Sequence, residues 1–308
     1  MKSYEAAPCS TERYYLGECA RWDEVRGELY WVNVAPGTGQ FFRARVDGVG
    51  VEIIAHYDFL GSLTAVAPME QREDGWIIAL DDSLLALNED GTTRTLASPE
   101  ARNYGEVRTN DGAADPWGAF WIGSMARDAA AGRGSLYCYH ESRDVETVRE
   151  GLTIANGIGW SPDARIVYHV DSGPGVIAAF DVDERGNVRS ERLFARFDVV
   201  TEGAPDGLCV DEDGNVWVAL WGGREVRQYT PNGEQVATVA VDTLQPSSCA
   251  LGGPNGSTLY ITTAQEGMSP QQLQDDHHAG RLFTCEVGVR GLPLNPYRPV
   301  LRGDINGQ

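Results

Sequence analysis

Four polar residues at matching places in a repeated sequence pattern could bind one metal ion together. They are Glu18, Asn110, Asn156 and Asp206, in the stretches Gly17-Glu18, Asn110-Asp111-Gly112, Ala155-Asn156-Gly157 and Pro205-Asp206-Gly207. Two carboxylates and two amides offer only oxygen ligands, which hard cations such as Ca²⁺, Mg²⁺ or Mn²⁺ prefer. The chain has only five histidines and no His-Glu-x-x-His motif, so the sequence does not indicate a histidine zinc site.

Each of these stretches has a second interpretation. Asn-Gly and Asp-Gly are common turn dipeptides, and any one of them alone is typical of a turn. Their occurrence at the same place in four repeats favours a site on which the four side chains converge.

Two further residues could contact a ligand of this site. Arg108 comes two residues before Asn110, so on a strand both side chains point to the same face. Its guanidinium could hold a hydroxyl or carboxylate, although a surface ion pair would fit the spacing equally well. Asp128 follows Met125-Ala126-Arg127, and its spacing alone indicates a solvated acid in a loop.

The elements that position these residues repeat six times along the chain. A turn containing Gly, Asp or Asn precedes a short aromatic or apolar run that is typical of a β-strand. The centres of these runs are Tyr30, Ile78, Trp121, Tyr168, Trp217 and Tyr260, spaced 43 to 49 residues apart. A period in the forties with short strands is typical of a β-propeller with about four strands per blade.

We therefore expect an all-β fold, a six-bladed β-propeller with four-stranded blades, formed by residues 1–308 as a single domain. Eleven or twelve residues before each centre, the chain should lie in the innermost strand that lines the central channel. In the two remaining repeats this step reaches Val66 and Cys249. The segment 10–15 is predicted to complete the last blade.

Charge and composition exclude several classes of partner. The formal net charge is −20, so nucleic acid and anionic membrane surfaces would be repelled. No segment is apolar enough for a membrane span, and the first residues do not resemble a secretory signal, so we expect a cytoplasmic protein with reduced cysteines. A contact between Cys209 and Cys249 stays open, and no pattern predicts the oligomeric state.

The same segments resemble the family of gluconolactonases, regucalcin (senescence marker protein) and luciferin-regenerating enzymes. The matching stretches are Leu16-Gly17-Glu18, Arg108-Thr109-Asn110-Asp111-Gly112, Asn156-Gly157-Ile158-Gly159-Trp160-Ser161-Pro162-Asp163, Asp171-Ser172, Pro205-Asp206-Gly207, Ser247-Ser248-Cys249 and Leu259-Tyr260-Ile261-Thr262-Thr263-Ala264. They follow the family's order from about residue 14 to residue 285.

This resemblance implies one divalent metal ion in the central channel, held by Glu18, Asn156 and Asp206. It implies substrate contacts from Arg108 and Asn110. A further sugar contact falls on Asp128, where regucalcin has the longer Glu. The family's usual Gly-Glu-Gly-Pro is Gly17-Glu18-Cys19-Ala20 here.

The resemblance also implies hydrolysis of a small-molecule sugar lactone to the aldonic acid. In this hypothesis Asp206 both ligates the ion and takes a proton from the attacking water. Ca²⁺, Mg²⁺, Mn²⁺ and Zn²⁺ all accept such ligands in part, so the sequence leaves the ion open. Two alternatives stay open: a metal-dependent esterase or phosphotriesterase, for which Trp117 and Trp221 could form an apolar rim, and a non-catalytic calcium-binding propeller.

Overall fold

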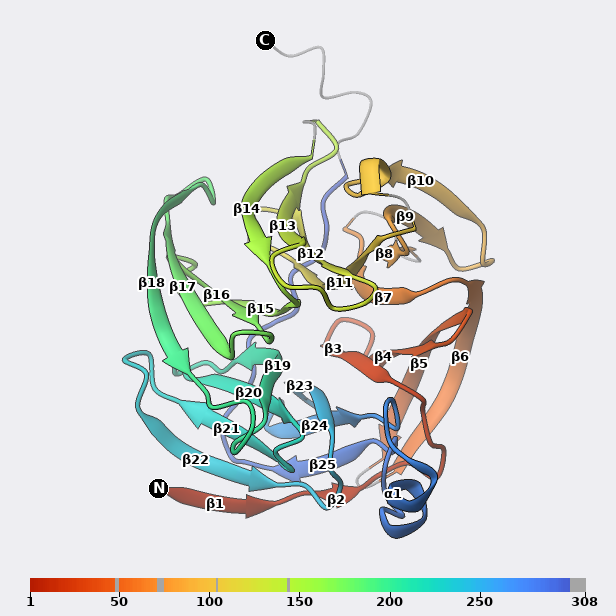
Figure 1. Ribbon diagram of the computed structural model, residues 1–308, viewed down its shortest axis with the longest axis vertical. Coiled ribbons are helices and arrows are strands. Elements are labelled where there is room, and N and C mark those ends of the chain that lie inside the picture. The colour runs from red at the N-terminus through yellow and green to blue at the C-terminus, as the bar shows by residue number, and fades with distance from the viewer. Residues whose placement is uncertain (48–49, 71–74, 104, 143–144, 300–308) are drawn as a thin grey trace.

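Six antiparallel sheets surround a central channel like the blades of a propeller (Figure 1). The computed structural model describes residues 1–47, 50–70, 75–103, 105–142 and 145–299. Each sheet begins with its innermost strand at the channel and runs outward in sequence order, except that two sheets end with a strand from the N-terminus at their outer edge. The predicted all-β, six-bladed β-propeller is confirmed.

The first three blades follow a simple up-and-down order. Blade 1 contains β3 (Gly17–Asp23), β4 (Glu28–Ala35), β5 (Thr38–Asp47) and β6 (Gly50–Leu60); blade 2 contains β7 (Leu63–Pro68), β8 (Gly75–Leu80), β9 (Ser83–Asn88) and β10 (Thr93–Ala97); blade 3 contains β11 (Val107–Ala114), β12 (Phe120–Ala126), β13 (Gly134–Tyr139) and β14 (Glu146–Leu152). A short 3₁₀ turn, Ala101–Asn103, lies between blades 2 and 3.

The other three blades include the two strands nearest the N-terminus. Blade 4 contains β15 (Ala155–Trp160), β16 (Ile166–Asp171), β17 (Val176–Val182) and β18 (Val188–Arg196); blade 5 contains β19 (Ala204–Val210), β20 (Val216–Trp221), β21 (Glu225–Tyr229), β22 (Gln235–Ala240) and β1 (Lys2–Glu5); blade 6 contains β23 (Pro246–Gly252), β24 (Thr258–Thr263), β25 (Phe283–Glu286) and β2 (Ala7–Pro8). The one helix of the described residues, α1 (Pro270–Asp275), follows β24. No helix in that part of the chain has the length and apolar character that a membrane span requires.

The second strand of each blade carries the core. All six predicted centres lie in these strands and are at most 4 % exposed: Tyr30, Ile78, Trp121, Tyr168, Trp217 and Tyr260. Their side chains fill the space between neighbouring sheets, which is why a large apolar residue recurs once per blade.

The ring is closed by the first residues of the chain. Strand β2 pairs with β25 as the outermost strand of blade 6, and β1 pairs in parallel with β22 of blade 5. The prediction that residues 10–15 complete the last blade was therefore wrong by a few residues. That segment instead leads the chain from the outer edge to β3 at the channel, and Tyr14 donates a backbone hydrogen bond to Gly280 on the way.

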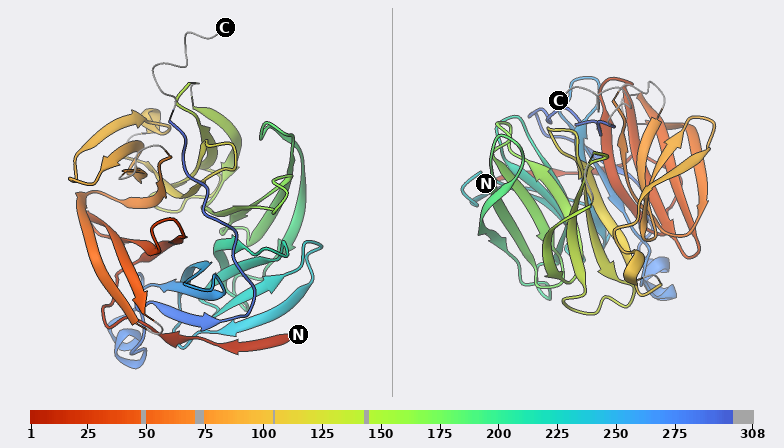
Figure 2. Two further views of the ribbon diagram at one scale, coloured as in Figure 1. Left: turned by 180° about the vertical axis from the view of Figure 1, so that it is seen from behind. Right: turned by 90° about the horizontal axis from the view of Figure 1, so that it is seen from above.

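The C-terminal segment 290–298, called the strap below, crosses the ring (Figure 2, left). It lines a cavity with late residues of the innermost strands, such as Val210 and Leu251, whereas Glu18 lines a separate pocket. The strap bridges to blade 5 between Gly291 and Asp211, and to blade 2 between Tyr297 and Met69. Tyr297 is fully buried and stacks on Tyr139, with ring centroids 5.9 Å apart. The strap thus covers one mouth of the channel.

Buried aspartates fix the turns between the first and second strands. Asp211 is fully buried and accepts hydrogen bonds from the backbone of Asn215, from Trp217 Nε1 and from Gln228 Nε2. Asp115 does the same for Trp121 in blade 3. These carboxylates satisfy the indole N–H groups of buried tryptophans, which would otherwise be costly to bury.

We expect Asp211→Ala to lower the free energy of unfolding by about 3 kcal/mol or more, because it leaves several buried donors without an acceptor. Urea denaturation of the purified variant measures the change. Asp213→Ala, in the same turn but exposed, is the matched control and should stay within about 0.5 kcal/mol of wild type. Equal losses in both variants would contradict the assignment.

Candidate functional site

The candidate site lies where the innermost strands begin. Glu18, Arg108, Asn110 and Asn156 line one small pocket in the channel, from β3, β11 and β15. Asp206 occupies the matching place in β19, and its carboxylate interacts electrostatically with Glu18. The structure therefore brings together the four residues that the repeat pattern predicted, and Arg108 with them.

A β-bulge interrupts every innermost strand near this point. In β11, β15 and β19 the register shifts across Asn110, Asn156 and Asp206. A bulge bends the strand and redirects a side chain, so these three residues leave the regular in-and-out alternation. In blade 2 the bulge lies at Thr64, which lines the same pocket, and not at Val66, which pairs with Ile78.

The glycines after the channel residues serve close packing between blades. A Cβ on Gly157 would lie 2.5 Å from the carbonyl oxygen of Asp206, and one on Gly207 would lie 2.4 Å from Ser248 Oγ. Both glycines lie inside strands. The turn interpretation of Asn-Gly and Asp-Gly is therefore wrong here: the glycine allows the next blade to approach.

A directed chain of hydrogen bonds orients the two amides. Arg108 Nη1 donates to Asn110 Oδ1 at 2.7 Å, and Asn110 Nδ2 donates to Asn156 Oδ1 at 3.0 Å. Asn156 Nδ2 donates to Ser172 Oγ at 2.9 Å, and Ser172 donates to the carbonyl of Pro205 at 2.7 Å. Because Ser172 takes the amide NH₂ of Asn156, the carbonyl oxygen of that side chain must face the pocket.

The acidic groups of the site repel one another. The pKa of Glu18 is raised to about 8, mainly by burial and then by the charges of Asp111 and Glu266, whereas the backbone N–H of Cys19 and the charge of Arg108 act against the shift. Burial, followed by Glu18, Asp111 and Glu266, raises the pKa of Asp206 well above its usual range. A cation in the channel would relieve this repulsion.

The donor set fits a hard divalent cation. Asp206 Oδ1 is buried without a hydrogen-bond partner, and Glu18 Oε2 accepts a hydrogen bond from the backbone N–H of Cys19. The described residues contain no group of three or more His, Cys, Asp or Glu placed to hold a metal. The candidate ligands are instead two carboxylates and the amide oxygen of Asn156, a set suited to Ca²⁺, Mg²⁺ or Mn²⁺.

One predicted residue lies outside the site, and three residues that were not predicted belong to it. Asp128 is exposed in the loop after β12 and accepts a hydrogen bond from the backbone of Ala130, outside the pocket that Glu18 lines. Ser172, Asp111 and Glu266 also act on the site, and the sequence pattern did not predict them. The pair Asp171-Ser172 was visible as a motif, but nothing in the spacing linked its hydroxyl to Asn156.

The architecture and the site match a known family. The protein-family model described as "SMP-30/Gluconolactonase/LRE-like region" matches residues 16–265. The chain belongs to this family. Among its relatives are regucalcin of Sus scrofa, 33% identical over 313 residues that cover 96% of this chain and 99% of the relative, and L-arabinolactonase of Azospirillum brasilense, 34% identical over 305 residues that cover 97% of each.

Solved structures of the gluconolactonase and regucalcin family show the same fold. A calcium-binding regucalcin from Agrobacterium tumefaciens superposes with a TM-score of 0.87 at 26% identity, covering 97% of this chain and 99% of that chain. A luciferin-regenerating enzyme gives a TM-score of 0.83 at 26% identity, covering 94% and 97%. The names of these relatives support sugar lactone hydrolysis at the level of the family.

One departure from the family pattern has a structural explanation. Cys19 stands where the family usually has the second Gly of Gly-Glu-Gly-Pro, and its φ is 53°, in the region that favours glycine. The Cys19 thiol is fully buried and lies 3.4 Å from the backbone nitrogen of Val66. The strained bulge beside Glu18 is thus retained with a side chain that packs against blade 2.

The raised pKa of Glu18 predicts how the metal-stripped protein responds to pH. The unfolded chain loses this proton near its ordinary pKa of about 4.5, and the folded protein only near 8. The unfolded state is therefore favoured progressively as pH rises through this window, and stability falls. Urea denaturation from about pH 5 to 8 should show the fall, and Glu18→Gln should reduce it. The exposed control Glu24→Gln should retain the wild-type slope; a wild-type slope in Glu18→Gln would contradict the assignment.

We expect Ser172→Ala to weaken divalent metal binding about 10- to 100-fold, because the Asn156 amide loses the acceptor that orients it. Calorimetric titration of the metal-stripped protein with Ca²⁺ and Mn²⁺ measures the change. Ser124→Ala removes another buried serine hydroxyl, in β12, and should bind like wild type. Equal affinity in both variants would show that Ser172 does not orient the ligand.

Proposed function

We propose that this protein hydrolyses a sugar lactone to the aldonic acid with one divalent metal ion held by Glu18, Asn156 and Asp206. The observation that supports this most directly is the convergence of these oxygen ligands in one channel with Arg108 and Asn110. A lactone is a cyclic ester, so its hydrolysis needs a polarised carbonyl, an activated water and support for the negative charge on the carbonyl oxygen.

A divalent ion bound at this site would polarise the lactone carbonyl and lower the pKa of a water molecule. Asp206 would accept a proton from the attacking water, and its buried Oδ1 has no competing hydrogen-bond partner. Water adds to the carbonyl carbon, the ring C–O bond breaks, and the proton passes to the leaving hydroxyl.

Arg108 and Asn110 would position the sugar. Burial lowers the pKa of Arg108 from its ordinary high value, but the guanidinium stays charged at neutral pH. It is fixed against Asn110 at 2.7 Å and so presents its other N–H groups in a set orientation. Such fixed donors fit ring hydroxyls and contribute by orienting the substrate. We propose a contact from Asp128 only if its loop approaches a bound sugar.

The ester alternative is less well supported. It would require an apolar rim at the entrance, but Trp117 lies in the turn after β11, at the opposite end of the channel from Asp206. Trp221, at the end of β20, lies on the side of Asp206, since it pairs with Ala204. The pocket beside Glu18 is lined by charged and amide groups, which favours a sugar.

The direct test is proton release from a panel of aldonolactones with five- and six-membered rings. Metal-stripped protein, protein with each of Ca²⁺, Mg²⁺, Mn²⁺ or Zn²⁺ restored, and a blank without protein are compared, because lactones also open unaided. We expect turnover of one or a few lactones that depends on the added ion. A folded, metal-binding protein without turnover on the panel would contradict the proposal and favour ester substrates or a non-catalytic role.

We expect Asp206→Asn to lower kcat on the best lactone about 10²- to 10⁴-fold, because an amide cannot accept the proton from water. Metal titration of the same variant shows whether it still binds the ion. Glu100→Gln is the control for loss of a buried carboxylate outside the channel, since Glu100 contacts Tyr137 and Asn103, and it should retain activity. Full activity of a metal-loaded Asp206→Asn would exclude Asp206 as the base.

A further inference from the structure

Two thiols face one another in the half of the channel that the proposed reaction does not use. Cys209 lies in β19 and Cys249 in β23, the innermost strands of blades 5 and 6, and their Sγ atoms are 3.9 Å apart. Both are free cysteines; Cys249 is fully buried and Cys209 is partly exposed. The sequence left open a contact between them, and the structure shows a contact without a disulfide.

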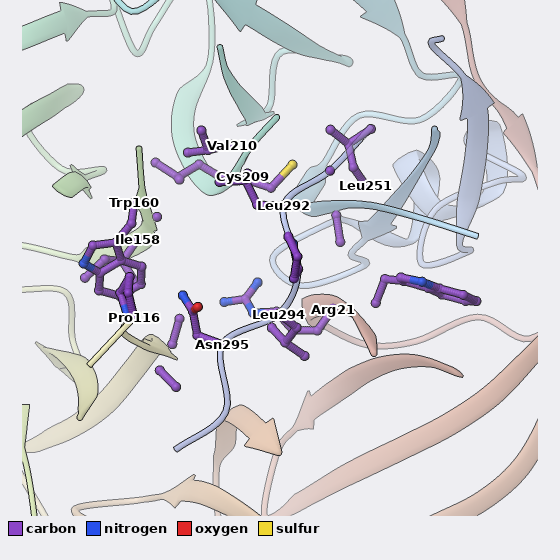
Figure 3. A pocket seen from close by; sticks show the side chains of 18 of the residues that line it. Arg21, Pro116, Ile158, Trp160, Cys209, Val210, Leu251, Leu292, Leu294 and Asn295 are labelled. Atoms are coloured by element: carbon purple, nitrogen blue, oxygen red, sulfur yellow. The ribbon is translucent and has the colours of Figure 1, made fainter. Parts of the chain in front are cut away.

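The pair opens into a cavity of about 260 Å³ beneath the strap (Figure 3). Apolar side chains such as Ile158, Leu251 and Leu292 form most of its wall, and the guanidinium of Arg21 supplies a positive charge. This cavity is separate from the pocket of Glu18 and Asn156, with which it shares no lining residue. No His, Asp or Glu is among the described residues that line it.

The distance between the sulfurs suits a bridging metal ion better than a disulfide. A disulfide requires an S–S bond of about 2.05 Å, so the thiols would have to approach each other by nearly half their separation. Two metal–sulfur bonds of about 2.3 Å hold their sulfurs roughly 3.8 Å apart at a tetrahedral angle and roughly 4.6 Å apart when linear. The observed 3.9 Å is close to the bent arrangement, and a linear ion would require the sulfurs to move apart by up to about 0.7 Å.

The two sulfur ligands limit which metal ions the site can bind. Zinc is almost always held by four ligands in structural sites, and the cavity offers two sulfurs. Soft thiolates select Cu(I), which needs no carboxylate or imidazole. When both thiols lose a proton and bind Cu⁺, two H⁺ are released and the complex carries one net negative charge. Arg21 pairs with Asp111 at 3.3 Å and also interacts electrostatically with both cysteines, so its guanidinium would offset part of the charge of that anion.

The neighbouring groups also explain why the two thiols are unreactive in the absence of a metal ion. The contact with Cys249, followed by burial, raises the pKa of Cys209 well above its usual range. Both disfavour the thiolate that attacks disulfides and oxidants, so the pair resists oxidation.

We propose that Cys209 and Cys249 form a two-coordinate site for a thiophilic monovalent cation of the Cu⁺ type. The site is independent of the proposed lactonase activity. Cys209 comes three residues after Asp206 in β19, and Cys249 Sγ contacts the carbonyl oxygen of Gly207 at 4.0 Å. The bound ion would therefore touch the strand that carries Asp206 from the opposite end of the channel.

The test is an anaerobic titration of the full chain, saturated with Ca²⁺, with Cu⁺ in competition with a coloured Cu⁺ chelator. We expect one equivalent of Cu⁺ to resist the chelator in the wild type. Cys209→Ser and Cys249→Ser should each lose that equivalent or bind it at least tenfold more weakly. Cys285→Ser, which removes a buried thiol of blade 6 outside the cavity, should retain it. Zn²⁺ should not replace Cu⁺ at equal concentration.

Three results would overturn the proposal. The first is a wild-type protein that retains no Cu⁺ against the chelator. The second is retention of the equivalent in Cys209→Ser, which would place the ion elsewhere. The third is a Cys209–Cys249 disulfide found by mass spectrometry in protein purified without reductant. If Cys249→Ser does not fold, the result for Cys209→Ser decides, because that residue is partly exposed and its substitution disturbs the core less.

Discussion

Repulsion between buried carboxylates is the constraint around which the channel is built. Glu18 lies in blade 1 and Asp206 in blade 5, and the charge of Glu18 raises the pKa of Asp206. Asp111 adds to the repulsion, although its own Oδ1 pairs with Arg21 at 3.3 Å. Such a cluster is stable only if protons or a cation compensate the charge, so the fold has to supply rigidity that the site itself does not.

That rigidity comes from the way in which neighbouring blades meet. The bulges direct Asn110, Asn156 and Asp206 into the channel, and the following glycines let the next innermost strand pack within contact distance. Ser172 then ties blade 4 to the backbone of blade 5 through Pro205. Contacts between blades therefore set the position and orientation of the ligand side chains, so a substitution in one blade can displace a ligand in the next.

The sequence predicted the ring and most of the site because both depend on periodic features. A large residue recurs at nearly constant spacing in the six second strands, and a polar residue recurs in the same way in four of the innermost strands. The structure places Tyr30 and Trp217 in equivalent positions, and it also places Asn156 and Asp206 in equivalent positions. A constant step could not locate the bulge in blade 2, which moved the channel position from Val66 to Thr64. It also could not show Ser172 or Glu266, whose roles depend on distances between blades. Cys209 and Cys249 belong to the same group, because only the packing of β19 against β23 brings their sulfurs together.

The closure of the ring has a consequence for synthesis on the ribosome. Ala7 pairs with Thr284, and Lys2 pairs with Ala237, so the first strands find their partners only when nearly the whole chain has emerged. At about 5–20 residues per second, that wait is roughly 15 to 55 s. During this time the N-terminal strands stay unpaired while the earlier blades assemble. The nascent chain therefore presents open sheet edges that chaperones can bind, and it closes them only after Thr284 has been synthesised.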